Sequence, residues 1–383
     1  MRRAAIFNWL VYRSIRLGRE SVATRRWRIG IYKVDRLGDF VLSVGAIRAI
    51  IEIAGVDNCV LIHSAASSQM ARREFQNIAR VEIPPLDGKL WVTRRRLRRL
   101  IQEEFQSGGV GQMLCLRHFR SLADEVALRM IPSSEVWCVR NSNTFSLDYE
   151  LVRSRFEGDV VVDRPARNSI PASCEDLACH ESLLRRWAGP KFAGRDVRPR
   201  IESNSRKRDQ ILAVSPFGSD RIRDLPLDRV AACVIHGRVS FGLSSVLLAP
   251  PDDLPRYQAF AAHLAEKGAI ASVLVTRTGD DLVDALAGSA VVLTTETATA
   301  HIATALDRPM VCLIGGGHYG QFAPWRLSNR QVWITSHIPC FNCNWHCMHP
   351  EPYCITRVAA EQLIQGLRLA FEASTTIPIQ VNA

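Results

Sequence analysis

Short hydrophobic runs alternate with amphipathic segments along most of this chain. The run Ile29–Val34 precedes a segment in which hydrophobic residues recur at spacings of three and four, from Phe40 to Ile51. This recurrence is typical of a helix with one buried face, and the short run is typical of a buried strand. A further short run, Cys59–His63, follows. Strands that alternate with helices predict a parallel sheet with helices on its faces.

The same alternation restarts in the second half of the chain. From about 163 to 208 the pattern weakens, with several prolines, one predicted helix at 176–187 and a polar run. Beyond it, strands are predicted at 211–215, 245–249, 270–275 and 291–294, and helices at 227–235, 256–267 and 281–287. The pattern predicts two parallel-sheet domains with a cleft between them.

The 383 residues suffice for two domains of ordinary size. We divide them into six parts: a basic N-terminal segment (1–28), an N-terminal domain (29–175), a linker (176–208), a C-terminal domain (209–339), a cysteine-rich insert (340–355), and a C-terminal helix and tail (356–383).

The N-terminal segment predicts a basic amphipathic helix. On a helix, Ile6, Trp9 and Leu10 form an apolar side next to Arg13 and Arg16. Such a helix fits an anionic membrane surface, although a terminal helix packed on the protein has the same pattern. No run of 18 apolar residues occurs, so no membrane-spanning helix is expected.

Arginine supplies most of the formal charge of +11. Arginine favours bidentate contacts with phosphate and carboxylate, which indicates phosphorylated or anionic partners. The arginines are not interleaved with aromatic residues on one short segment, so nucleic acid is not expected. Eleven cysteines, seven of them scattered singly, are typical of a reducing cytosol rather than of a secreted disulfide scaffold.

The segment 291–317 predicts a strand, a helix, a second strand and a turn of three glycines. Thr295 or Thr297 could cap the helix, whose N-terminus would favour an anion. The triple glycine Gly315, Gly316 and Gly317 would leave only backbone in the way of a ligand. This arrangement is how α/β proteins bind phosphorylated ligands, but any such unit also needs caps and glycines.

Two further turns follow predicted strands. Asp39 lies in the first turn of a helix after the first strand, where it is either a general base or a helix-capping carboxylate. The segment Ser215–Pro226 has a Gly-Ser turn and two arginines before a helix. It predicts a cradle for a diphosphate, with a polar surface turn as the alternative.

These motifs in this order resemble glycosyltransferase family 9, the heptosyltransferase family of lipopolysaccharide core assembly. The resemblance rests on RLGD before the first helix, SPFGS before Leu225-Pro226, and TTETATAHIATALDRPMV. It implies an α/β protein of the GT-B fold, with two Rossmann-like domains facing across a cleft. It also implies inverting transfer from a nucleotide-diphospho-sugar, ADP-heptose in most members, to a glycan hydroxyl.

The resemblance assigns roles residue by residue. It implies that Asp39 is the catalytic base and that Arg223 and Ser219 bind the donor phosphates. It places the donor against Glu296, Thr297, Ala298 and His301, to which we add the glycine turn and, for the ribose, Asp253. The family usually has Lys, Asp and Gly where this chain has Arg223, Glu296 and Ala298, and Trp at Leu225. These changes could alter the sugar or nucleotide, or abolish catalysis.

An anionic glycolipid acceptor is expected to bind the basic surface of the N-terminal domain, through Arg36, Arg94, Arg95 and Arg98. Such an acceptor predicts a cytoplasmic protein in peripheral contact with the inner face of the inner membrane. No Asp-x-Asp triplet occurs, so catalysis is expected to need no metal cofactor.

Four cysteines of the insert have the spacing of a metal site: Cys340, Cys343, Cys347 and Cys354. Four thiolates would close a structural site, for zinc more readily than for iron. Free thiols or local disulfides are the alternative.

Three other functions remain open from the sequence. A glycosyltransferase of the same fold could act on protein rather than lipid. A catalytically inactive nucleotide- or nucleic-acid-binding protein would show no turnover. A nicotinamide-dependent oxidoreductase is disfavoured because no G-x-G-x-x-G follows a first strand.

Overall fold

The computed structural model describes residues 25–84, 86, 90–141, 158–165, 174–203 and 210–375, which form two compact units. Unit 1 contains the described residues before 166 together with 176–197. Unit 2 contains residues 174–175 and the described residues from 198 onward.

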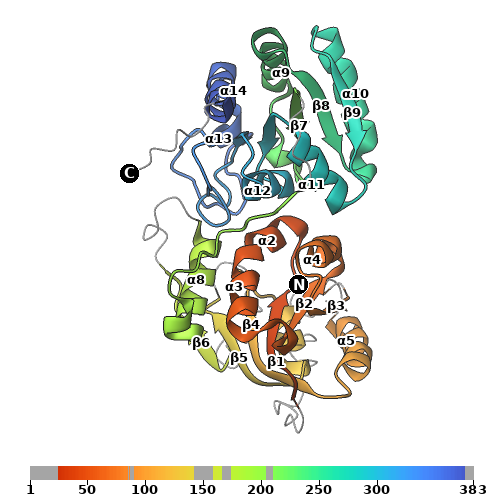
Figure 1. Ribbon diagram of the computed structural model, residues 1–383. Helices are drawn as coiled ribbons and strands as arrows, with labels where there is room; N and C mark the ends of the chain where they lie inside the picture. The colour runs from red at the N-terminus through yellow and green to blue at the C-terminus, as the bar shows by residue number, and fades with distance from the viewer. Residues whose placement is uncertain are drawn as a thin grey trace. The chain divides into compact units, whose positions relative to one another are not determined.

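Unit 1 is a parallel sheet of six strands covered by helices (Figure 1). The strands lie in the order β3-β2-β1-β4-β5-β6. Their bounds are β1 (Arg25–Lys33), β2 (Cys59–Ser64), β3 (Ala79–Ile83), β4 (Gly109–Cys115), β5 (Ser133–Val139) and β6 (Val160–Val162). The sequence placed the first strand at Ile29, but β1 begins at Arg25, so residues 25–28 belong to the sheet. The rest of the predicted N-terminal helix lies outside the described residues.

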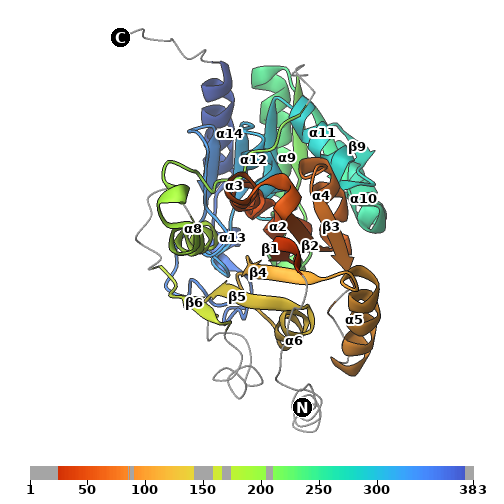
Figure 2. The same cartoon turned by 60° about the horizontal axis from the view of Figure 1, so that its bottom comes forward.

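The helices of unit 1 cover both faces of its sheet. They are α2 (Leu37–Leu42), α3 (Val44–Ala54), α4 (Ser68–Glu74), α5 (Leu90–Glu104), α6 (Leu122–Met130) and α8 (Glu175–Ala188). Helices α5 and α6 pack against each other, on the face away from α2, α3 and α4 (Figure 2).

Helix α8 packs on unit 1, although the sequence assigned residues 176–208 to a linker. The indole N–H of Trp187 donates a 3.0 Å hydrogen bond to the Gln112 side chain on β4. One face of α8 buries Leu177, Leu183 and Leu184. The chain from Asp176 to Val197, which includes nearly all of this helix, therefore belongs to unit 1.

Unit 2 repeats the architecture with a second parallel sheet, in the order β12-β11-β10-β7-β8-β9. Its strands are β7 (Ile211–Ser215), β8 (Ser244–Ala249), β9 (Ala271–Val275), β10 (Val291–Thr295), β11 (Met310–Leu313) and β12 (Gln331–Ile334). Its helices are α9 (Leu227–Phe241), α10 (Leu254–Glu266), α11 (Gly279–Gly288), α12 (Ala298–Ala305), α13 (Tyr353–Thr356) and α14 (Ala360–Thr375).

Both sheets have the same strand order, in which the first and fourth strands of each unit are neighbours. The chain reverses its direction of strand addition between β1 and β4 in unit 1, and between β7 and β10 in unit 2. In open α/β sheets, ligands bind at the carboxyl ends of the strands at such a reversal. The fold therefore directs attention to the segments that follow these four strands.

No helix among the described residues is long and apolar enough to cross a membrane. The seven scattered cysteines are all buried, as expected of reduced core cysteines.

Candidate functional site

The reversal point of unit 1 holds a buried lysine between two aspartates. Lys33, the last residue of β1, is fully buried. Its Nζ lies 3.1 Å from Asp35 Oδ2 and 4.0 Å from Asp176 Oδ2, and it donates a 2.9 Å hydrogen bond to the Leu116 carbonyl. Burial acts to lower the pKa of Lys33, but the neighbouring aspartates raise it above its ordinary value. Lys33 is therefore a buried cation.

Two histidines lie beside Asp176 in the same network. The Nδ1 of His118, which follows β4, lies 3.2 Å from Asp176 Oδ1, and the Nε2 of His180 lies 3.6 Å from it. Burial acts to raise the pKa of Asp176, but His180, Lys33 and His118 together hold it well below its ordinary value. Asp176 is thus a carboxylate, which balances the charge of Lys33.

Arg117 completes this network. Its guanidinium pairs with Asp35, and its Nη2 lies 3.0 Å from Asp124 Oδ2. Asp124 also accepts a 3.0 Å hydrogen bond from the hydroxyl of Tyr32. The segments after β1 and β4 are therefore joined by buried or half-buried charges.

Asp39 lies half-buried in the first turn of α2, beside this network. Its pKa is raised to about 7, first by burial and then by the negative charge of Asp35, against the opposing effect of Lys33. No side chain caps α2. A carboxylate with a pKa near neutrality is suited to accept a proton at physiological pH.

The reversal point of unit 2 is built around Arg223. This residue ends the turn η4 (Arg221–Arg223), which follows β7. Its Nη1 donates a 3.4 Å hydrogen bond to the Glu296 carbonyl, and its Nη2 donates to the Ser219 hydroxyl. The Thr295 hydroxyl in turn donates a 2.6 Å hydrogen bond to the Arg223 carbonyl. Ser219, Arg223 and Glu296 therefore meet at one edge of the sheet.

Arg223 has an unused donor. Its Nε is buried and has no hydrogen-bond partner among the described residues. A buried N–H without a partner is costly, and a ligand oxygen would satisfy it.

The other residues predicted to hold the donor differ in their surroundings. Glu296 is buried, whereas Thr297 and Ala298 at the start of α12 are half-buried. Thr297 is the N-cap residue of α12, one of the two positions expected from the sequence, but its side chain makes no capping hydrogen bond, and the Thr295 hydroxyl is directed to Arg223. His301 is buried and accepts a 3.1 Å hydrogen bond from the Trp325 indole. His301 therefore has a packing role within unit 2.

The triple glycine is covered by aromatic side chains. A Cβ at Gly315 or Gly317 would overlap the ring of Trp345, and a Cβ at Gly316 would overlap Phe341. The expectation that only backbone lies over this turn is therefore wrong. The rings come from the cysteine-rich insert, and glycine is needed because they pack directly on the main chain.

Asp253 lies after β8, where it pairs with Arg256. The Nη1 of Arg256 lies 3.5 Å from Asp253 Oδ2, and its Nη2 pairs with Asp224. The same guanidinium stacks 3.7 Å above the ring of Phe217. Asp224 accepts a 3.0 Å hydrogen bond from the Gly218 amide. This network fixes the shape of the Gly-Ser turn.

The four clustered cysteines are near one another but do not form a metal site as they stand. Burial raises the pKa of Cys354, and the neighbouring Cys343, Cys340 and Cys347 add to the effect. Across the described ranges, no three His, Cys, Asp or Glu side chains converge as metal ligands do. The donor set suits a soft metal, but its geometry does not, so the metal site stays a prediction from sequence.

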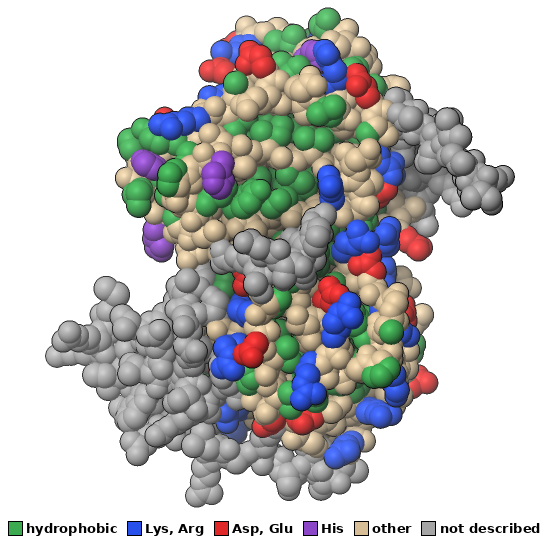
Figure 3. Space-filling view, turned by 90° about the vertical axis from the view of Figure 1, so that its left-hand side faces the viewer, with side chains coloured by type: hydrophobic (Ala, Val, Ile, Leu, Met, Phe, Trp, Pro, Cys, Tyr) green, Lys and Arg blue, Asp and Glu red, His purple; other side chains and the backbone are tan. Residues whose placement is uncertain are grey.

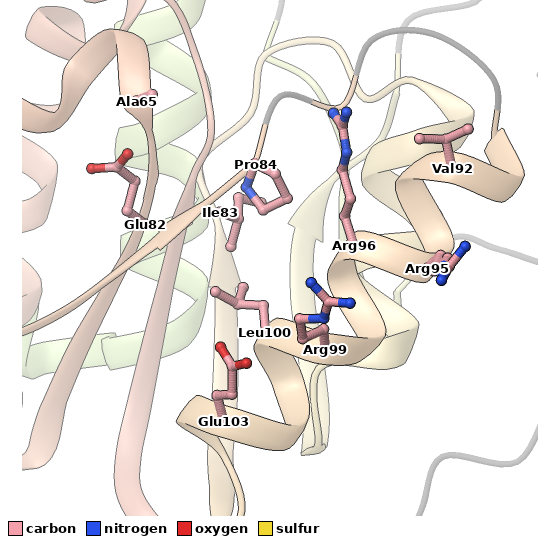
Figure 4. A pocket seen from close by; sticks show the side chains of 10 residues that line it. All are labelled: Ala65, Glu82, Ile83, Pro84, Val92, Arg95, Arg96, Arg99, Leu100 and Glu103. Carbon is pink, nitrogen blue, oxygen red and sulfur yellow. The ribbon is translucent and has the colours of Figure 1, made fainter.

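Helix α5 lines a pocket of about 670 Å3 in unit 1 (Figure 4). Arg95, Arg96 and Arg99 project from the helix, with Ile83 and Pro84 at the end of β3 across from them. Of the three arginines predicted on this helix, Arg95 lines the pocket, whereas Arg94 and Arg98 are not among its lining residues. Arg36 is exposed ahead of α2.

Acidic side chains lie among the basic ones in two described parts of unit 1. Glu82 and Glu103 also line the α5 pocket. On the side drawn in Figure 3, basic and acidic side chains are interspersed over this unit. On that face the positive charge of the described residues is therefore not concentrated in one patch.

Sequence reasoning missed Lys33, Asp176 and Trp345. Lys33 carried a signal, because a lysine at the end of an apolar strand is buried only with a partner. Asp176 gave no local signal, since its partners come from β1 and from the segment after β4. Trp345 was missed because it lies between Cys343 and Cys347, and that segment was interpreted only as a metal site.

Residues 233–349 match the sequence profile of glycosyltransferase family 9 (heptosyltransferase). No curated protein matches the chain in sequence. The resemblance predicted from the sequence is thus confirmed within unit 2.

Solved structures match over most of the chain. A family 9 glycosyltransferase from Veillonella parvula has a TM-score of 0.67 and 13% identity, with 92% of this chain and 100% of that chain covered. The ADP-heptose lipopolysaccharide heptosyltransferase II of E. coli has a TM-score of 0.64 and 14% identity, with 91% and 100% covered. The iron-containing dodecameric glycosyltransferase TibC of E. coli has a TM-score of 0.51 and 10% identity, with 93% and 78% covered. The predicted GT-B fold is confirmed.

Proposed function

We propose that this protein is an inverting glycosyltransferase that transfers heptose from ADP-heptose to a hydroxyl of an anionic lipopolysaccharide-type glycan. The observation that carries the proposal is Asp39, a carboxylate with a pKa of about 7 at the reversal point of unit 1. Ser219, Arg223 and Glu296 meet at the corresponding point of unit 2, where Arg223 has an unused donor. The family match and the ADP-heptose substrate named for a solved relative supply the sugar and the nucleotide.

In this proposal Asp39 accepts the proton of the acceptor hydroxyl. The hydroxyl oxygen forms a bond to the anomeric carbon of the donor as the bond to the diphosphate oxygen breaks. The bonding electrons leave with the ADP, and attack from the opposite face inverts the anomeric configuration. A pKa near 7 keeps much of Asp39 ionised at neutral pH and still basic enough to take the proton.

The leaving diphosphate gains negative charge, which Arg223 is suited to stabilise. Its guanidinium presents several donors in a fixed plane, and the Ser219 hydroxyl lies beside it. We assign the same donor-binding role to Glu296, Thr297 and Ala298, with Asp253 at the ribose. His301 and the glycine turn would support the donor site indirectly, without touching the donor, since other side chains of unit 2 already pack on them.

No step of this proposal uses a metal ion. TibC is described as iron-containing, and the cysteines of this chain would have to move to bind a metal with all four thiols. A metal bound there would be structural, because four thiolate ligands leave no open position.

For the acceptor we propose arginines of unit 1. Arg36 and the arginines of α5 would bind its phosphates or carboxylates. An acceptor of this kind would place the protein in the cytoplasm, in peripheral contact with the inner membrane.

The test is donor turnover with a matched variant. ADP-, GDP- and UDP-sugars are incubated with the protein, with and without a heptose-free lipopolysaccharide acceptor, and released nucleotide is measured. We expect acceptor-dependent release of ADP from ADP-heptose. Asp39→Asn should lower it by roughly 10²–10⁴-fold, the usual contribution of a general base.

The control is Asp57→Asn, an exposed aspartate of unit 1 that should leave the rate unchanged. If Asp39→Asn stays within about threefold of the wild type, Asp39 is not the base. If no nucleotide-sugar is turned over, the proposed activity is wrong.

A further inference from the structure

The cysteine-rich insert is held tightly on the glycine turn of unit 2. The amide of Asn342 donates a 2.7 Å hydrogen bond to the Gly316 carbonyl, and the amide of Asn344 donates a 3.1 Å hydrogen bond to the Gly317 carbonyl. With Trp345 and Phe341 on the glycine main chain, these bonds leave no room for a side chain at the turn. The insert is therefore part of the body of unit 2 at this point.

Trp345 adopts a backbone conformation that its side chain disfavours. Its φ is +64°, and the left-handed region is unusual for a bulky residue. Asn342 and Asn344 also have positive φ, which asparagine tolerates better. Strained residues of this kind persist where the surrounding structure holds them and are often found at functional sites. In this conformation the Trp345 ring lies on the glycine turn.

The edge of the Trp345 ring is fixed as well. Its Nε1 donates a 3.3 Å hydrogen bond to Nδ1 of His318, and the two rings meet edge to face with centroids 6.0 Å apart. His318 directly follows the glycine turn. The indole is therefore held on one side by Gly315 and Gly317 and at its edge by His318.

The ring also faces the phosphate-binding arginine. The guanidinium carbon of Arg223 lies 5.8 Å from the Trp345 ring centroid, within the range of a cation–π interaction. Arg223 is thus held by Trp345, by Ser219 and by the Glu296 carbonyl. Two of these contacts come from segments that the family motifs identify, and the third comes from the cysteine-rich insert.

We propose that Trp345 is a positioning residue of the donor site, whose ring, fixed on the glycine turn, holds the Arg223 guanidinium in place for the donor diphosphate. This inference rests on the proposed function, because it takes the ligand of Arg223 to be a nucleoside diphosphate. It gives the insert a role in substrate binding that needs no metal. An arginine with fewer accessible rotamers loses less entropy when it binds phosphate, so fixing it strengthens binding.

The experiment compares a ligand that has the diphosphate with one that lacks it. Affinities for ADP and adenosine are measured by ligand-observed NMR, which reaches millimolar constants, for the wild type, Trp345→Leu, Trp345→Phe and Phe341→Leu. Trp345→Leu should weaken ADP binding by roughly 3- to 30-fold, the range of a cation–π contact. Adenosine binding should stay within about twofold, since it makes no phosphate contact. Trp345→Phe, which keeps a ring face, should recover most of the ADP affinity.

Phe341→Leu is the matched control, because Phe341 packs on the same glycine turn through Gly316 while its ring lies against those of Tyr319 and His337. It should leave the ratio of ADP to adenosine affinity unchanged. Equal weakening of both ligands in Trp345→Leu, or no change at all, would overturn the inference, as would the same selective loss in Phe341→Leu. A wild type that does not bind ADP would instead refute the proposed donor, and the inference with it.

Discussion

The Nζ of Lys33 lies 3.1 Å from Oδ2 of Asp35 at the end of β1, and both side chains act on the pKa of Asp39. Asp35 raises that pKa and Lys33 lowers it, so the two charges have opposite effects on how readily the proposed base takes up a proton. The activity of the enzyme should depend on pH accordingly.

The acid limb of the pH–rate profile should lie near pH 7. Below this value Asp39 is protonated and cannot accept a proton, so kcat/KM should fall with falling pH. Asp35→Asn removes the negative charge that raises the pKa of Asp39, and the limb should move to lower pH. The shift is measured by recording kcat/KM against pH for the wild type and for Asp35→Asn in one buffer series. A limb that stays in place would show that another group controls the rate.

Asp39→Asn should not lose stability above pH 7. The pKa of Asp39 is raised in the folded protein, so the folded state binds its proton more tightly than the unfolded state does. The wild type should therefore lose stability as the pH rises from about 4 through 7, where the half-buried carboxyl ionises. The neutral amide avoids this loss, and at pH 8 the melting temperature of the variant should equal or exceed that of the wild type. A clearly lower value would mean that the ionised carboxylate stabilises the fold.

Arg223→Ala should raise the KM for ADP-heptose and lower kcat. Hydrogen bonds to charged groups contribute about 1.5–3 kcal/mol, which corresponds to roughly 10- to 150-fold in kcat/KM. Arg221→Ala is the matched control, because Arg221 lies in the same turn and is exposed. Steady-state kinetics of the two variants separate a phosphate contact from a general effect of positive charge. Equal losses in both would favour the second explanation.

Gly317→Ala should destabilise unit 2 by about 1–3 kcal/mol, because the added methyl group overlaps the Trp345 ring. In a Trp345→Ala background the same change should cost much less, since the ring is gone. Urea unfolding of the four proteins gives the coupling energy of this cycle. A coupling near zero would place the ring away from the glycine turn.

EDTA should not reduce the rate of transfer, because side chains rather than a divalent cation are proposed to stabilise the leaving diphosphate. The measurement is nucleotide release before and after dialysis against the chelator, and again after addition of Mg²⁺. Loss of activity that Mg²⁺ restores would contradict the proposal.

The sequence by itself determined the α/β class and most of the elements. The hydrophobic runs at Ile29–Val34 and at 291–294 indicated buried strands of a covered sheet, because strands of parallel sheets are apolar on both faces. The turns after these strands could be identified for the same reason, since carboxyl ends of parallel strands share one edge. Asp39 and the turn that holds Ser219 and Arg223 were singled out in this way, whereas the role of Glu296 was implied only by the resemblance to family 9.

Only the tertiary structure decided what surrounds those residues. The sequence could not show that Asp176, from a helix assigned to a linker, balances Lys33 beside Asp39, because electrostatic partners are set by packing and not by spacing along the chain. It also could not show that the triple glycine is covered by Trp345 and Phe341. A glycine allows close approach of either a ligand or a side chain, and which of the two occupies the space depends on where the rest of the chain folds.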